Sequence, residues 1–152
     1  MALYFLDTSA LAKLYVREEG TDSILALTKA EHGNEFALLS IATLEFRSAV
    51  RRRQRAGDID EPTASEILTL FGSHREERFI VQPLTEAVLD GAARLIDRHF
   101  LRAYDAVQLS GCLTFASNRS ACIFTCSDEA LLQAARSEGL LTFDPAAQKT
   151  SA

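Results

Sequence analysis

The chain has 152 residues, of which 47% are hydrophobic and 24% charged, a composition that predicts one compact domain over residues 1–145 with a frayed tail at 146–152. The net charge of −5 argues against a protein that holds nucleic acid by bulk attraction to clustered Lys and Arg. Apolar runs fall short of the roughly 20 residues that span a bilayer, and the N-terminus lacks a basic leader, so we expect a soluble, cytoplasmic protein with no membrane partner.

The first half of the chain predicts strands alternating with helices. Residues 3–6 form a short apolar strand that ends at Asp7, and Thr8 and Ser9 are expected to cap the next helix. A second helix is predicted from Thr21 to about residue 32, and a buried strand over 35–39. A long helix follows from Ser40 to near residue 57 and places Glu45 in its second turn. A further helix starts near residue 62, where a Pro suits the first turn.

The second half continues the same alternation. We expect a strand over 79–81, a helix capped by Thr85, and another helix over 103–115 with Asp105 at its N-terminal end. A strand over 121–126 leads into a helix that begins at Ser127 and Asp128, and a last strand covers 140–143. Apolar strands alternating with helices indicate a parallel sheet covered on both faces, hence a three-layer α/β/α fold.

Four acids are expected at one edge of this sheet. Asp7 and Asp128 follow directly after strands, while Glu45 and Asp105 lie in early turns of helices that begin near the same edge. Ligands gather at the carboxyl ends of parallel strands, and clustered carboxylates need a compensating cation. Oxygen ligands without His or Cys favour Mg²⁺ or Mn²⁺.

Each acid also has an ordinary structural explanation. Asp7 and Asp128 suit helix N-caps, and Glu45 could occupy a solvated helix position. The argument for a metal site therefore depends on the four acids together. Structural zinc is not expected, because the cysteines are odd in number, lie among apolar residues and are far from the three His in sequence; they are Cys112, Cys122 and Cys126.

Four stretches, in order and nearly spanning the chain, resemble PIN-domain nucleases, and more narrowly the VapC toxins of bacterial toxin–antitoxin pairs. They are YFLDTSALAKLY from Tyr4, ATLE ending at Glu45, LRAYDAVQL around Asp105, and CSDEAL around Asp128. The pattern departs from the family at Cys126, where Thr or Ser is common.

The resemblance implies a PIN-like fold with strand order 3-2-1-4-5 and a metal-dependent ribonuclease. It implies that Asp7, Glu45, Asp105 and Asp128 bind the metal, that Ser9 supports them, and that a homodimer is covered by a small antitoxin. The bound ion would activate water for phosphodiester hydrolysis. A non-catalytic PIN-like module that binds RNA or protein remains the alternative function.

Basic residues concentrate on the helix that carries Glu45. By default this run is a solvated helix face, but its position makes it a candidate for contact with RNA phosphates or an acidic partner segment. The candidates are Arg47, Arg51, Arg52, Arg53 and Arg55 on this helix, with Arg98 and Arg102 before Asp105 as a second patch.

Overall fold

The computed structural model describes residues 1–119 and 121–147. Its centre is a five-stranded sheet in the order β3-β2-β1-β4-β5, with every neighbouring pair parallel. This order confirms the predicted one. The strands are β1 (Leu3–Leu6), β2 (Glu35–Leu39), β3 (Phe79–Gln82), β4 (Ile123–Thr125) and β5 (Leu141–Phe143).

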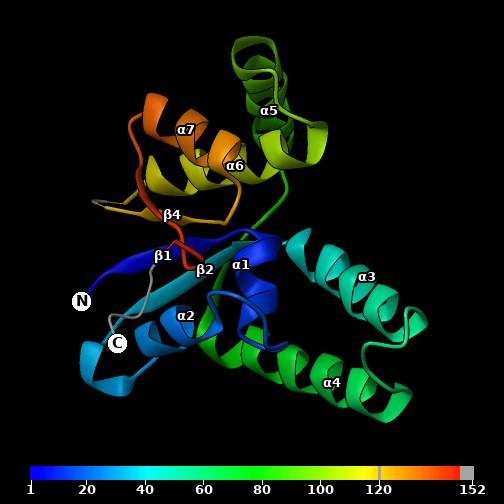
Figure 1. Ribbon diagram of the computed structural model, residues 1–152. Coiled ribbons are helices and arrows are strands. Elements are labelled where there is room, and N and C mark those ends of the chain that lie inside the picture. Colours follow the sequence, from blue (N-terminus) through cyan, green and yellow to red (C-terminus); the bar gives the residue numbers. More distant parts are fainter. Residues whose placement is uncertain (120, 148–152) are drawn as a thin grey trace.

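Helices cover both faces of the sheet (Figure 1). One layer holds α1 (Thr8–Lys13), α2 (Thr21–Leu27), the short 3₁₀ turn η1 (Ala30–His32), α3 (Ala42–Arg55) and α4 (Glu61–Arg78). The other layer holds α5 (Glu86–His99), α6 (Ala103–Ala116) and α7 (Glu129–Ser137). The predicted three-layer α/β/α architecture is therefore confirmed.

Alternation along the strands divides the apolar interior into two cores. Phe5 of β1 belongs to the core under α5, α6 and α7, and the next residue, Leu6, belongs to the core under α1 to α4. In the second core the rings of Phe46 and Phe71 meet edge to face, with centroids 4.6 Å apart, and join α3 to α4. This contact helps to hold α3, which carries Glu45, against α4.

Several element boundaries differ from the sequence predictions. The helix predicted from Thr21 to about residue 32 ends at Leu27, because the Thr28 hydroxyl donates to the carbonyl of Leu25 at 2.7 Å and Lys29 is extended. Asp7, rather than Thr8 or Ser9, caps α1. The long third helix begins at Ala42, which puts Glu45 in its first turn, and β4 is only three residues long. Of the predicted tail, 148–152 lie outside the described residues.

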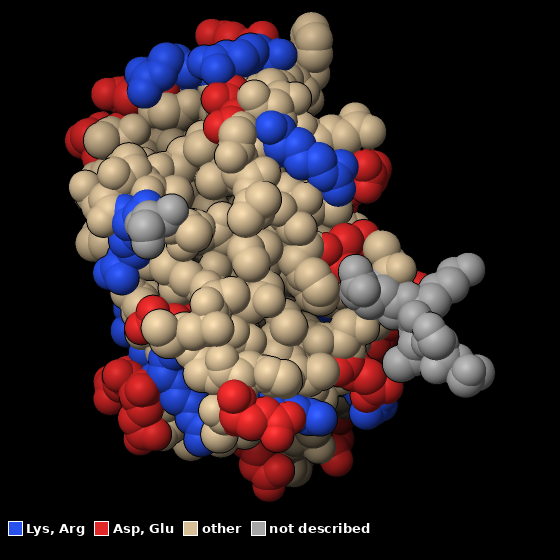
Figure 2. Space-filling model, turned by 90° about the vertical axis from the view of Figure 1, so that its left-hand side faces the viewer, with Lys and Arg blue, Asp and Glu red and all other residues tan. Residues whose placement is uncertain are grey.

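The carboxyl ends of the central strands align at one edge. Leu6 pairs with Leu38 of β2 and with Thr125 of β4, so Asp7 follows at the middle of that edge. The opposite edge, seen in Figure 2, has a largely uncharged centre with charged side chains gathered above and below it. No helix of the described residues is long and apolar enough to cross a membrane.

Candidate active site

A cavity of about 610 Å³ opens at the carboxyl edge of the sheet. Three of the four predicted acids line it, and each comes from a different part of the fold. They are Asp7 at the end of β1, Glu45 of α3 and Asp105 of α6. The remaining lining residues are Thr8, Ser9, Leu44, Ser48, Ala49, Arg52, Arg102, Tyr104 and Gln108.

Asp7 is the most buried of these acids, with 7% of its surface exposed. Its Oδ1 accepts hydrogen bonds from the Ala10 backbone N–H at 2.8 Å and from the Ser9 hydroxyl at 2.7 Å. The pKa of Asp7 is nevertheless raised to about 7, mainly by burial; the two hydrogen bonds lower it, and the charges of Asp105 and Glu45 contribute to the rise. Asp7 is thus both a helix cap and a destabilised anion in need of a positive partner.

Glu45 is held by two polar side chains from other elements. One carboxylate oxygen, Oε2, accepts a hydrogen bond from the Thr8 hydroxyl and one from the Gln108 amide, the latter at 3.4 Å. Gln108 also donates to Thr8 at 3.2 Å and is 3% exposed. The other oxygen, Oε1, is buried and has no hydrogen-bond partner within the described residues. The same is true of Oε1 of Gln108. Burial is also the main cause of the raised pKa of Glu45.

Asp105 completes the trio from the first turn of α6. Its Oδ2 accepts from the Arg102 side chain at 3.1 Å, and Arg102 is itself largely exposed. Tyr104 stands beside it at the cavity wall, about half exposed. The Arg102 cation therefore balances one negative charge at the site from a largely exposed position.

Asp128 does not line this cavity. It caps α7 through a hydrogen bond from the Leu131 backbone N–H at 2.9 Å. It remains close to the site through its neighbour, because the Ser127 backbone N–H donates to the Ser9 hydroxyl at 3.4 Å. The Cys126 thiol is buried and contacts the Asp128 carbonyl at 3.7 Å, and burial raises its pKa. A metal-binding role of Asp128 therefore stays a prediction.

The arginines predicted as a basic patch on α3 have different neighbours in the structure. Arg52 lines the cavity, while Arg53 pairs with Glu18 and Arg51 donates to Gln54 at 2.8 Å. Arg47 and Arg55 are exposed and do not line the cavity. Of the predicted basic candidates, Arg52 and Arg102 are the two at the carboxylate site.

The chemistry of this cavity fits a divalent cation. Buried carboxylates with raised pKa values and an unpartnered oxygen on Glu45 are the environment that a hard cation stabilises. Within residues 1–119 and 121–147, however, no three His, Cys, Asp or Glu side chains are arranged to hold an ion directly. An ion at this site would therefore be bound partly through water, or after Asp105 leaves Arg102.

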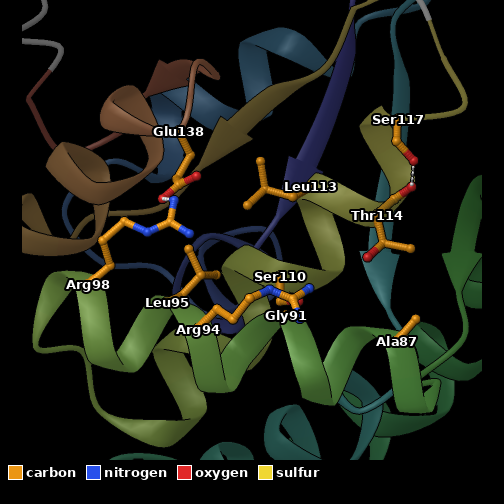
Figure 3. Close-up of a pocket in the computed structure, with 10 residues that line it drawn as sticks. All are labelled: Ala87, Gly91, Arg94, Leu95, Arg98, Ser110, Leu113, Thr114, Ser117 and Glu138. Carbon is orange, nitrogen blue, oxygen red and sulfur yellow. Dashed lines mark hydrogen bonds and ion pairs between the residues drawn. The ribbon is translucent and has the colours of Figure 1, made fainter.

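A second cavity, of about 340 Å³, lies between α5, α6 and the end of α7 (Figure 3). Its one lining acid, Glu138, accepts from Arg98 and from the ring of His99, each at 2.7 Å. This acid is already paired with the Arg98 cation, so the cavity does not resemble a metal site. His99 is packed against Glu138, with 16% of its side chain exposed, and Arg98 belongs to this ion pair.

Sequence reasoning missed Thr8 and Gln108 as functional candidates. Both lie within the stretches that carry the family resemblance, but their hydrogen bonds to Glu45 join residues 37 and 63 positions apart in the chain. The spacing along α6 could have indicated Gln108, because it follows Asp105 by three residues and so shares its helix face.

Comparisons with known proteins agree with this geometry. A family model described as PIN domain matches residues 4–150. A curated relative named Ribonuclease VapC47, from Mycobacterium tuberculosis, is 28% identical over 147 residues, which are 95% of this chain and 98% of the relative.

Solved structures share the fold at low identity. VapBC2 from Rickettsia felis, bound to a DNA fragment from its promoter, has a TM-score of 0.64 at 15% identity and covers 93% of this chain and 98% of that chain. PAE2754 from Pyrobaculum aerophilum has a TM-score of 0.63 at 23% identity, over 93% and 83% of the two chains. Because the family model covers nearly the whole chain, this protein belongs to the PIN domain family.

Proposed function

We propose that this protein is a metal-dependent endoribonuclease that hydrolyses RNA phosphodiester bonds, and that it is the toxin of a VapBC-like toxin–antitoxin pair. The observation that carries the proposal is the convergence of Asp7, Glu45 and Asp105 on one cavity, with raised pKa values for the first two. The curated relative named as a ribonuclease and the toxin–antitoxin complexes among the structural neighbours support it.

The residues present have distinct roles in this reaction. A bound Mg²⁺ or Mn²⁺ supplies a nucleophilic water and a counter-charge for the phosphate. Asp7 and Asp105 would hold the ion, and Asp128, at the neighbouring helix end, would be a further ligand. Glu45, fixed by Thr8 and Gln108, holds the ion or orients the attacking water. Ser9 orients Asp7.

Arg52 and Arg102 give the cavity mouth the positive charge that RNA phosphates need, in a chain whose net charge is −5. They are also available to pair with acidic residues of a partner. We also propose a small antitoxin that covers the cavity, because the structural neighbours include toxin–antitoxin assemblies. A homodimer stays an expectation from the family resemblance.

Product analysis tests the hydrolytic mechanism. Purified protein is incubated with a labelled single-stranded RNA and with DNA of the same sequence, in Mn²⁺, and the new ends are identified by mass spectrometry. Attack by water gives RNA products without a 2′,3′-cyclic phosphate, whereas attack by the ribose hydroxyl leaves one. A Glu45→Gln variant prepared in parallel should be inactive. Cyclic ends, or equal cutting by the variant, would point to a contaminating nuclease or another mechanism.

The toxin assignment needs a test in cells. Expression of the parent without a partner should slow growth, and co-expression of a short reading frame encoded directly upstream should restore it. The Glu45→Gln variant should not slow growth. Normal growth at high soluble expression of the parent would favour the alternative, a PIN-like module that binds RNA or protein without cleaving it.

A further inference from the structure

Cys112 and Cys122 form a buried thiol pair outside the carboxylate cavity. Cys112 lies in α6 and is fully buried, while Cys122 immediately precedes β4 and is 5% exposed. Their Sγ atoms are 3.8 Å apart, and both thiols are free. A disulfide needs about 2 Å between sulfur atoms. The two sulfur atoms are therefore already neighbours, and bond formation requires them to approach by about 1.8 Å.

Cys122 is the member of the pair that an oxidant can reach. It lines a cavity of about 240 Å³ together with Arg119 and Leu140, whereas Cys112 does not. Because Cys122 precedes the first residue of β4, this cavity lies at the amino edge of the sheet, the side seen in Figure 2, away from Asp7. The Arg119 guanidinium is held nearby, 4.6 Å from the ring centroid of Phe115.

The surroundings make the two thiols chemically unequal. The hydrogen bond from Cys112, the backbone of Phe5 and the charge of Arg119 lower the pKa of Cys122 despite its burial. Burial, and next the contact with Cys122, raise the pKa of Cys112. The thiolate is the form that reacts with oxidants. Cys122 is therefore the first thiol to react, and Cys112 is the neighbouring thiol that resolves the product.

We propose that Cys112 and Cys122 are a peroxide-oxidisable dithiol, a modification site separate from the nuclease cavity. Hydrogen peroxide transfers one oxygen to the Cys122 sulfur, which becomes a sulfenic acid as water leaves. The Cys112 sulfur then attacks the Cys122 sulfur, the S–O bond breaks, and a second water leaves with the Cys112 proton. Two thiols are oxidised to one disulfide, and one peroxide is reduced to two waters.

The disulfide would connect α6 to the start of β4. The same helix carries Asp105 and Gln108 at the other end, so the bond would tie the scaffold of the carboxylate site to the sheet. Closing the loop from 112 to 122 restricts the unfolded chain. We expect the oxidised protein to melt about 5–10 °C above the reduced protein.

Peptide mapping tests this proposal directly. Trypsin cleavage gives a peptide of residues 103–119 with Cys112 and a peptide of residues 120–136 with Cys122 and Cys126. A Cys126→Ala variant therefore leaves one cysteine in each peptide. After peroxide and alkylation of the folded protein, we expect the two peptides to be cross-linked in a monomer lighter by about 2 Da, two hydrogen atoms.

The parent chain supports the same test without that substitution, because chymotrypsin cleaves after Phe124 and separates Cys122 from Cys126.

Two variants test the roles of the individual residues. In Cys112→Ser, peroxide should leave a sulfenic acid on Cys122 that dimedone traps. Arg119→Gln, as the single change in the parent chain, should slow the oxidation. Free, alkylatable thiols under conditions that fully oxidise glutathione, cross-links between chains only, or an oxidised protein that melts below the reduced one would overturn the proposal.

Discussion

At the scale of single residues, the burial of Asp7 links metal binding to pH. The pKa of Asp7 is about 7 in the folded, metal-free protein and 3.8 for an ordinary Asp. At a pH between these two values, the Asp7 carboxyl group is deprotonated in the unfolded chain but still protonated in the folded chain. The free energy of unfolding of the metal-free protein therefore falls as pH rises from 3.8 to about 7, by at most ~4 kcal/mol.

The first prediction follows for Asp7→Asn, which keeps an N-cap residue but removes the buried charge. In chelator at pH 8 the variant should be more stable than the parent, with the difference vanishing toward pH 4. Asp60→Asn is the matched control, because Asp60 caps α4 at an exposed position where hydrogen bonds to Thr63 lower its pKa. Chemical unfolding across pH measures both. Equal effects of the two substitutions would mean that Asp7 is only a cap.

The second prediction concerns the amide that fixes Glu45. Gln108→Leu keeps the side-chain volume near the parental value but removes both donated hydrogen bonds. We expect Mn²⁺ binding and RNA cleavage to weaken by about 10- to 100-fold, the usual effect of losing a residue that supports a metal ligand. Isothermal titration with Mn²⁺ measures the first quantity independently of activity. Gln133→Leu, on the exposed surface of α7, should leave both unchanged. A Gln108 variant that behaves like this control would remove the positioning role.

How far the sequence predicts these residues depends on the range of their contacts. Asp7, Glu45 and Asp105 are predictable because each is an acid at a strand end or early helix turn, and the parallel sheet brings those points together. The sequence predicts the capping of α7 by Asp128 as an alternative to metal binding, but the separation of Asp128 from the cavity depends on local turn geometry that the motif does not encode. The arrangement of Thr8 and Gln108 around Glu45 depends on tertiary contacts between three helices.

At the scale of elements, α3 presents different arginines to different neighbours. The sequence does not show which arginine faces the cavity, because Arg51, Arg52 and Arg53 are consecutive and chemically identical. The structure is needed to distinguish their positions. Successive residues of a helix point about 100° apart. One of the three therefore meets the cavity, while its neighbours pair with Gln54 and Glu18.

The third prediction tests this division. In chelator, where cleavage is stopped, Arg52→Gln should bind single-stranded RNA several-fold more weakly than the parent, because a phosphate contact at the cavity is lost. The slope of log affinity against log salt should fall by about 0.7, the value for one contact to a single strand. Arg47→Gln removes the same charge from an exposed position of α3 and should change neither quantity. Equal losses in both variants would indicate a diffuse basic surface.

The fourth prediction concerns the contact between α5 and α6, which supports Asp105. A Cβ on Gly91 would lie 2.3 Å from the Ser110 hydroxyl, which donates to the Val88 carbonyl at 2.6 Å inside the core. Gly91→Ala must displace this hydroxyl and leave a buried polar group without its partner. Gly72→Ala in α4 meets nothing within 4 Å and should stabilise its helix.

Thermal and chemical unfolding compare the two glycine variants, which receive the same gain in helix propensity. Gly91→Ala should be less stable than Gly72→Ala by about 1–3 kcal/mol. A difference near zero would show that the two helices can separate without cost, and that their contact does not fix α6.

At the scale of the whole molecule, the fold follows from a few strong sequence features. Each central strand is an apolar segment flanked by helices, so both sheet faces had to be buried and the pairing had to be parallel. The boundaries were less predictable where local polar groups compete with the helix, as at Thr28. The strand order depended on the family resemblance, because periodicity alone does not say which strands are neighbours.

We propose that the cavity lined by Asp7, Glu45 and Asp105 cleaves RNA only with a divalent metal ion. The most direct measurement is the initial rate of RNA cleavage by the parent and by Asp7→Asn as Mn²⁺ is titrated, with a chelator as the zero point. We expect the rate for the parent to rise to saturation with Mn²⁺ and to vanish in chelator, and we expect a loss of at least ~100-fold in the variant. Undiminished cleavage in chelator by the pure parent, or near-parental cleavage by Asp7→Asn, would contradict it.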